Sequence, residues 1–278
     1  MARKKNTLLN LRDFLIAKAE YYNNPNFIAT DPISVPHRFT QRQDIEIAAF
    51  FAATLAWGQR STIIAKCTEL LAMMDNRPYE FVVQHKPHEL KPFTKFKHRT
   101  FNATDTLYFI ESLSGLYKSY ASLEEVFVQN LNLAQPAAAD VFLIEHALIQ
   151  FNKMFFRLPD APARTHKHVS TPARKSACKR LNMFLRWMVR QDTCGVDFGI
   201  WKKISPSQLV CPCDVHVERV ARHFNLITRK GMSWQTAIEL TSALRQLNPA
   251  DPVVFDFALF GMGVMENHPP GARSYIIN

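Results

Sequence analysis

The sequence predicts an all-α protein with two lobes. Apolar residues recur at spacings of three to four along much of the chain, no segment shows convincing apolar–polar alternation, and no internal repeat is present. Glycine is scarce, with eight glycines against sixteen prolines, which disfavours glycine-rich phosphate loops and glycine-punctuated β-sandwiches. A length of 278 residues suits one large domain or two lobes that share a core. We therefore expect a single two-lobed helical domain over residues 1–278.

The first lobe is expected over residues 44–156. Apolar spacing, helix-capping residues and breaker residues predict helices over 6–24, 45–57, 62–74, 105–119, 122–132 and 137–156. The near-continuous apolar run of 45–57 indicates a helix buried on most sides. Gln59 and Arg60 follow it in a turn between two helices, where they are either available to a ligand or part of a plain polar turn.

The second lobe is expected over residues 157–264, and it begins with a polar, proline-containing connector. Helices are predicted over 173–190, 215–224, 233–247 and 251–264. The helix over 173–190 has an apolar stripe at helical spacing, made of Ala177, Leu181, Phe184, Leu185 and Met188. A second face carries Lys175, Lys179, Asn182, Arg186 and Arg190 without an acidic residue, whereas a solvated helix face usually mixes both signs.

The net charge of +10 is concentrated in this region. Residues 153–190 contain ten Lys or Arg residues and one acidic residue, Asp160, so that segment carries +9. Such a local excess predicts contact with nucleic-acid phosphates, with Arg186 and Arg190 as phosphate ligands. The alternative is a basic surface that only confers solubility.

Asp214 precedes the helix over 215–224 and is a natural N-cap, which stabilises a helix by about 1 kcal/mol. Cys211, Cys213 and His216 are metal-ligand types, but three ligands at this tight spacing are a weak zinc signal, so we expect no metal. The five scattered cysteines indicate free thiols in a reducing cytoplasm. Because no secretory signal or long apolar segment is present, we expect a cytoplasmic protein with no membrane partner. The oligomeric state is left open, with a monomer favoured.

Two short motifs give the chain a resemblance to a known superfamily. Lys179 lies at the head of Leu-Asn-Met-Phe-Leu-Arg-Trp-Met, and Pro212-Cys-Asp-Val-His216 follows after a loop. This order resembles the helix-hairpin-helix DNA glycosylases, in particular the 8-oxoguanine branch, as a remote bacterial offshoot. Upstream, Ala48 to Gln59 is similar to the buried helix that ends near DNA in that superfamily. The resemblance covers about residues 44–264.

The resemblance implies a glycosylase-like fold, duplex DNA as partner and no cofactor. It implies Lys179 and Asp214 as catalytic residues of a DNA-repair N-glycosylase, with possible abasic-site lyase activity. Its implied nucleic-acid contacts are Gln59, Arg60, Lys175, Arg180, Arg186, Arg190 and His216. Lys175 is a rival nucleophile. The alternatives are a non-catalytic DNA- or RNA-binding protein of the same fold, and a helical adaptor protein.

Two departures from the superfamily pattern are visible. The glycine-rich hairpin is replaced by Thr165 to Ser176, so side chains would have to supply its phosphate contacts. The chain also lacks a C-terminal cluster of four cysteines, which excludes an iron–sulfur glycosylase.

Overall fold

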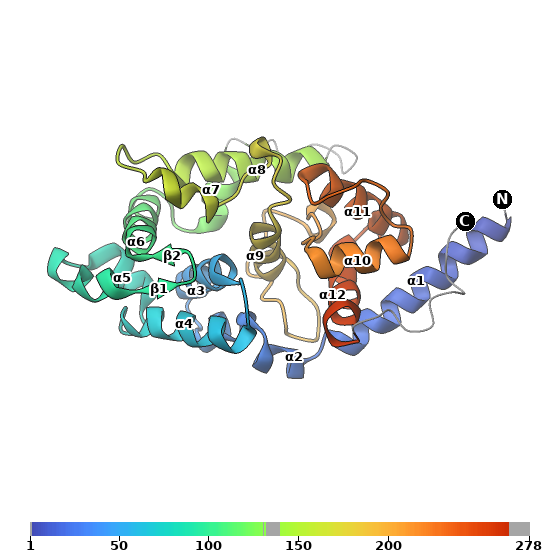
Figure 1. The fold of residues 1–278 in the computed structure, drawn as a ribbon, viewed down its shortest axis with the longest axis horizontal. Helices are drawn as coiled ribbons and strands as arrows, with labels where there is room; N and C mark the ends of the chain where they lie inside the picture. Colours follow the sequence, from blue (N-terminus) through green and yellow to red (C-terminus); the bar gives the residue numbers. More distant parts are fainter. Residues whose placement is uncertain (1, 130, 132–139, 267–278) are drawn as a thin grey trace. The chain divides into compact units, whose positions relative to one another are not determined.

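The computed structural model of the protein describes residues 2–129, 131 and 140–266, and this part of the chain is mostly helical (Figure 1). The α-helices are α1 Ala2–Tyr22, α2 Pro25–Thr30, α3 Arg42–Leu55, α4 Arg60–Ala72, α5 Pro78–Gln84, α6 Ala103–Tyr117, α7 Leu123–Val128, α8 Asp140–Phe155, α9 Lys179–Val189, α10 Val215–His223, α11 Trp234–Leu247 and α12 Phe255–Met265. Strands β1 Lys97–His98 and β2 Phe101–Asn102 pair antiparallel. The all-α prediction is confirmed.

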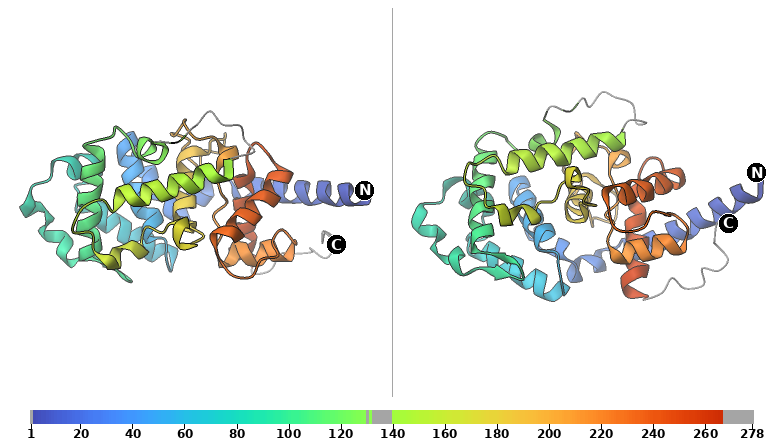
Figure 2. Two further views of the ribbon diagram at one scale, coloured as in Figure 1. Left: turned by 90° about the horizontal axis from the view of Figure 1, so that it is seen from above. Right: turned by 45° about the horizontal axis from the view of Figure 1, so that its top comes forward.

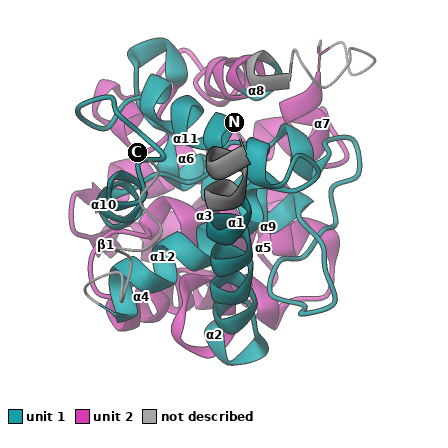
Figure 3. Ribbon diagram, turned by 90° about the vertical axis from the view of Figure 1, so that its right-hand side faces the viewer, with its two compact units in different colours: residues 1–27, 134–144, 172–278 teal, residues 28–133, 145–171 magenta. Residues whose placement is uncertain are grey.

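The chain divides into two compact units (Figure 3). Unit 1 consists of residues 1–27, 134–144 and 172–278, and unit 2 of residues 28–133 and 145–171. This division differs from the predicted lobes at 44–156 and 157–264. Residues 157–171 belong to unit 2, the segment 134–144 belongs to unit 1, and the N-terminal helix belongs with the C-terminal half. The sequence pattern of each segment contains no information about which distant segment it joins.

The core of unit 2 is built around α3. Its residues from Ile47 to Ala53 are at most 1% exposed, as the continuous apolar run predicts. The Phe50 ring lies 5.6 Å from Phe109 of α6 and 5.5 Å from Phe151 of α8, and Phe151 stacks on Phe127 at 4.1 Å. Aromatic pairs at these distances stabilise the fold by more than the burial of their apolar surface alone. The aromatic contacts therefore join segments of unit 2 that are far apart in sequence.

Asp105 joins the start of α6 to the short 3-10 helix Ala163–Lys167 in unit 2. It is fully buried and accepts hydrogen bonds from the Asn102 amide at 2.9 Å and from Thr165 Oγ1 at 2.7 Å. Arg164 Nη1 pairs with it at 2.5 Å, and His168 Nε2 lies 3.4 Å away. Burial acts to raise the pKa of Asp105, but the His168, Asn102 and Thr165 hydrogen bonds outweigh it and lower this pKa to about 2.

The lowered pKa makes the stabilising effect of Asp105 depend on pH. Because the folded-state pKa lies below the unfolded value near 3.8, the stabilisation is fully present above that value and is lost as pH falls toward 2. We expect Asp105→Asn to lower the free energy of unfolding by about 2 kcal/mol between pH 5 and 7. Urea unfolding from pH 7 to pH 3 checks this. The difference from wild type should shrink below pH 4, and a constant difference would contradict the assignment.

Unit 1 is centred on α12. In the views of Figures 1 and 2, α12 lies beside the C-terminal part of α1 and beside α10, and these are the most extensive helix contacts of the unit. A methyl group at Gly261 would overlap the Tyr22 ring of α1. Gly263 is also tightly packed, since a Cβ there would lie 3.0 Å from His216 Cβ of α10. These two glycines let α12 approach both neighbours closely, which brings the start of α10 next to α12.

Candidate active site

Helix α9 begins at Lys179 and not near residue 173 as the sequence predicts. Pro172–Arg174 forms a 3-10 turn, and both Lys175 (φ 60°) and Cys178 (φ 49°) have left-handed backbone conformations. Two such residues cannot continue a right-handed helix. Lys175 is therefore an exposed residue of the preceding turn and does not share a helical face with Lys179. The predicted apolar stripe is nevertheless buried, with Ala177, Leu181, Phe184, Leu185 and Met188 at most 8% exposed.

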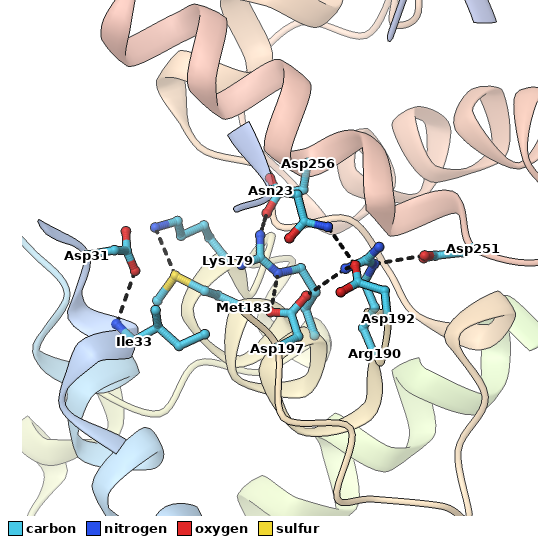
Figure 4. Close-up of polar contacts among 11 residues, drawn as sticks. Asn23, Asp31, Ile33, Lys179, Met183, Arg190, Asp192, Asp197, Asp251 and Asp256 are labelled. Atoms are coloured by element: carbon cyan, nitrogen blue, oxygen red, sulfur yellow. Dashed lines mark hydrogen bonds and ion pairs between the residues drawn. The ribbon is translucent and has the colours of Figure 1, made fainter. Parts of the chain in front are cut away.

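The prediction that Arg186 and Arg190 bind phosphate is wrong, because both side chains are buried and paired within unit 1. Arg186 and Arg190 are only 4% and 3% exposed. Arg186 Nε lies 3.3 Å from Asp197 Oδ1, and its Nη1 pairs with Asp256. Arg190 contacts Asp192 at 2.6 Å, Asp197 at 3.2 Å and Asp251 at 2.8 Å (Figure 4). Arg186 and Arg190 do lie close together on α9 as predicted, but carboxylates from later segments cover them.

The contacts between α9 and α12 show that the two helices run antiparallel. Lys179 Nζ lies 5.9 Å from the centre of the Phe260 ring, Arg186 pairs with Asp256, and Arg190 pairs with Asp251 just before α12. The Phe257 ring packs under both guanidinium groups, at 4.3 Å from Arg186 and 5.3 Å from Arg190. The position of Lys179 is therefore fixed by a buried network along the same helix.

The two carboxylate oxygens of Asp214 make different contacts. Oδ1 accepts the backbone amides of His216 at 2.9 Å and Val217 at 3.0 Å, so Asp214 is the N-cap of α10 as the sequence predicts. Oδ2 lies 3.7 Å from Lys179 Nζ. The Lys179 and Asp214 side chains are 25% and 19% exposed, so the pair is partly shielded from water and still open to a ligand.

The environment of the amine is apolar on two sides. Met183, one turn further along α9, has its Sδ 3.6 Å from Lys179 Nζ (Figure 4). The half-buried Phe260 of α12 has its ring centre 5.9 Å from the same amine. Val215, directly after Asp214, is 66% exposed. An ion pair edged by a thioether, an aromatic ring and an exposed aliphatic side chain can receive a flat ring with a polar edge.

Asp256 is a site residue that the sequence analysis did not identify. Its pKa is raised to about 6 by burial, against the opposing effect of Arg186, while Asp214 raises it and Lys179 lowers it. Asp256 is 4% exposed, and its Oδ1 has no hydrogen-bond partner among the described residues. Phe260 and Asp256 are four residues apart on α12 and therefore share a face of the helix. This spacing is the sequence signal that could have grouped Asp256 with Phe260. The segment Asp251 to Asp256 indicated only a helix start.

The remaining predicted contacts of unit 1 are less exposed than expected. Arg180 is half-buried, and burial lowers its pKa. His216 is half-buried beside Gly263 of α12, and its Nδ1 has no hydrogen-bond partner among the described residues. The exposed side chains close to Lys179 in sequence are Arg174 and Lys175. These two are the better phosphate candidates.

Gln59 and Arg60 lie in unit 2, where they begin α4. Gln59 is exposed at the N-cap position without a side-chain cap hydrogen bond, and Arg60 is the half-buried first residue of the helix. The predicted turn between two packed helices is thus confirmed, and its function stays a prediction.

Comparison with known proteins identifies the family to which the chain belongs. A family model with the description "Protein of unknown function (DUF2400)" matches residues 31–265. The chain belongs to the DUF2400 family. Lys179, Asp214 and Asp256 all lie within the DUF2400 match. No curated protein and no solved structure matched the chain.

Among the described residues, no group of three or more His, Cys, Asp or Glu side chains is arranged to hold a metal ion. None of the helices in the described part of the DUF2400 chain has the length and apolar character needed to cross a membrane.

Proposed function

We propose that this DUF2400 protein is a DNA-repair N-glycosylase with abasic-site lyase activity, acting on a damaged base, such as an oxidised purine, flipped out of duplex DNA. The observation that carries the proposal is the pairing of Lys179, the first residue of α9, with Asp214, the N-cap of α10, at 3.7 Å. A lysine beside a carboxylate supplies a nucleophile and a group for proton transfer.

The chemistry needs only this pair and the substrate. The unprotonated Lys179 amine forms a bond to C1′ of the sugar while the bond from C1′ to the base breaks, and the departing base takes up a proton. The adduct then opens to an imine, from which the 3′ strand can be eliminated. In this proposal Asp214 Oδ2, 3.7 Å from Lys179 Nζ, accepts the proton of the Lys179 ammonium and offsets positive charge that develops on the sugar.

The charge distribution supports a polyanionic substrate, although with fewer cations than the sequence suggests. Of the ten basic residues in 153–190, Arg164, Arg186 and Arg190 are paired with buried carboxylates. Arg174 and Lys175 remain exposed in the turn that leads directly into Lys179. They are suitably placed to bind phosphates on either side of a nucleotide whose sugar reaches the amine. Flipping the nucleotide is required because C1′ and the base are otherwise within the duplex stack.

Borohydride trapping tests the proposal. Duplexes that contain an abasic site or an oxidised purine are incubated with the protein and sodium borohydride, and the covalent adduct is measured on a denaturing gel. We expect wild type to form the adduct and Lys179→Gln to reduce it to background. The matched variant Lys175→Gln, which loses a phosphate contact, should form less adduct than wild type but well above background. The Lys175 change removes a neighbouring cation and leaves the proposed nucleophile in place.

Two other outcomes would contradict the proposal and identify the alternatives. Duplex binding that is intact in wild type and Lys179→Gln, with no adduct in either, would indicate a non-catalytic nucleic-acid-binding protein. If binding to duplex DNA is undetectable even at low salt, a helical adaptor protein is indicated instead.

A further inference from the structure

Unit 2 presents one tryptophan to solvent. Trp57, in the turn between α3 and α4, is 51% exposed, whereas Trp187, Trp201 and Trp234 are at most 2% exposed. The guanidinium carbon of Arg99 lies 4.6 Å from the centre of the Trp57 ring, so one face of the indole is covered by a cation. Trp57 is thus half exposed with a cation over one face of its ring, in contrast to the three core tryptophans.

The backbone around Trp57 is built to hold this pair together. Gly58 has φ +114°, and a Cβ there would lie 3.0 Å from Arg99 Nη1. Arg99 itself has φ +53° in the turn that joins β1 and β2. The preceding residue, His98, is 5% exposed and donates from Nε2 to the Leu55 carbonyl at 3.1 Å. The hairpin is thus fixed to the end of α3, and the Arg99 side chain is pre-positioned over the indole.

A row of cations leads up to Arg99. Lys91, Lys95 and Lys97 are exposed, and like Arg99 they form no ion pair with a carboxylate of the described residues. The aromatic residues that alternate with them, Phe93, Phe96 and Phe101, are at most 2% exposed and belong to the core. Lys66 of α4 lies over the Phe96 ring at 5.7 Å, which places this segment alongside α4, the helix that follows the Trp57 turn.

We propose that Trp57, Arg99, Lys91, Lys95 and Lys97 form a surface that binds an unpaired stretch of a DNA strand. A base stacks on the indole, and the flanking phosphates contact Arg99 and the lysines. An exposed aromatic ring next to a track of unpaired cations is the arrangement by which proteins bind single strands without reading their sequence. The geometry is specific to an unpaired strand, because in intact duplex DNA the faces of the bases are covered by their neighbours.

This inference does not depend on Lys179 chemistry. It concerns residues of unit 2 only, and its ligand is any single-stranded DNA segment. It would hold for a non-catalytic binding protein, and it would fail separately if Lys179 forms an adduct but Trp57 does not contact DNA.

Intrinsic fluorescence provides a direct test, since Trp57 is exposed and the other three tryptophans are buried. A short single-stranded oligodeoxynucleotide is titrated into the full-length protein at low salt. We expect saturable quenching that Trp57→Phe abolishes, because the remaining tryptophans do not contact the ligand. Anisotropy of a labelled oligonucleotide should show that Trp57→Ala weakens binding by about five-fold or more. The same change at the exposed aromatic Tyr21 of α1, Tyr21→Ala, should leave affinity within about two-fold.

The cations are tested by the salt dependence of binding. Replacing Lys91, Lys95 and Lys97 by Gln together should reduce the slope of log affinity against log salt by about 0.7 for each phosphate that these lysines neutralise in the wild-type protein. Lys153→Gln, at an exposed position of α8, is the matched control and should leave the slope unchanged.

Three results would overturn the inference. Binding measured by anisotropy without any change in tryptophan fluorescence would show that the strand binds elsewhere. Equal quenching by an intact duplex of the same sequence would show that the indole contacts the backbone and not a base. If the single strand does not bind at low salt, the proposed DNA-binding surface does not exist.

Discussion

Asp214→Asn is expected to reduce the rate of base release and strand cleavage by about 10²- to 10⁴-fold while leaving the free energy of unfolding nearly unchanged. Asn is as good an N-cap as Asp, so its side-chain oxygen can still accept the His216 and Val217 amides that Asp214 Oδ1 accepts. The variant loses the negative charge that faces Lys179 Nζ, and with it the proton acceptor. Single-turnover kinetics on lesion-containing duplex, together with urea unfolding, measure the two effects.

Asp214→Ala is the matched comparison. It removes the charge and the cap together, so we expect the same loss of activity and in addition a loss of about 1 kcal/mol in stability. If Asp214→Asn retained wild-type activity, the carboxylate would be a helix cap and no more, and the proposed pairing would have no catalytic role.

Arg186→Met is expected to lower the free energy of unfolding by about 3–5 kcal/mol. The change leaves Asp256 buried without its cation, whereas Asp197 keeps Arg190, and uncompensated buried charge is costly. The loss should be smaller at pH 5 than at pH 8. Because the pKa of Asp256 is already raised to about 6, the folded variant takes up a proton as pH falls through that range, which removes the uncompensated charge.

Arg222→Met is the control for the loss of an arginine. Arg222 is half-buried and pairs with Glu218 one turn away on α10 at 2.6 Å. Pairs of this type contribute a few tenths of a kcal/mol, so this variant should lose less than about 1 kcal/mol. Chemical denaturation of both variants at the two pH values checks the difference. Equal losses would mean that the buried network does not stabilise α9 more than a surface pair would.

Local sequence patterns were sufficient for most of the helices. The continuous apolar run of α3 predicted its burial, and Asp214 predicted the start of α10, because both signals lie within one element. The short helices α2 and α5 were missed, since six or seven residues give too little periodicity to recognise. The two-residue strands of the hairpin give no alternation at all.

The errors at the candidate site have a common physical cause. Whether Arg186 faces solvent or Asp256 depends on where a segment 70 residues later packs, and no pattern within α9 contains that information. The helix was predicted to start at residue 173, six residues too early. The actual start is later because Lys175 and Cys178 have left-handed backbone conformations, which the residue types Lys and Cys do not suggest. Asp214 was identified as a helix N-cap and Lys179 through the resemblance to the glycosylases, and the structure brings the two side chains to 3.7 Å.

The most direct test of the central claim is to identify the lysine that becomes bonded to DNA. The borohydride-trapped adduct with abasic-site duplex is digested with nuclease and protease, and the modified peptide is located by mass spectrometry. We predict that the sugar remnant is attached to Lys179 Nζ. Attachment to Lys175, to the N-terminal amine or to scattered surface lysines would contradict the proposed role of the Lys179–Asp214 pair.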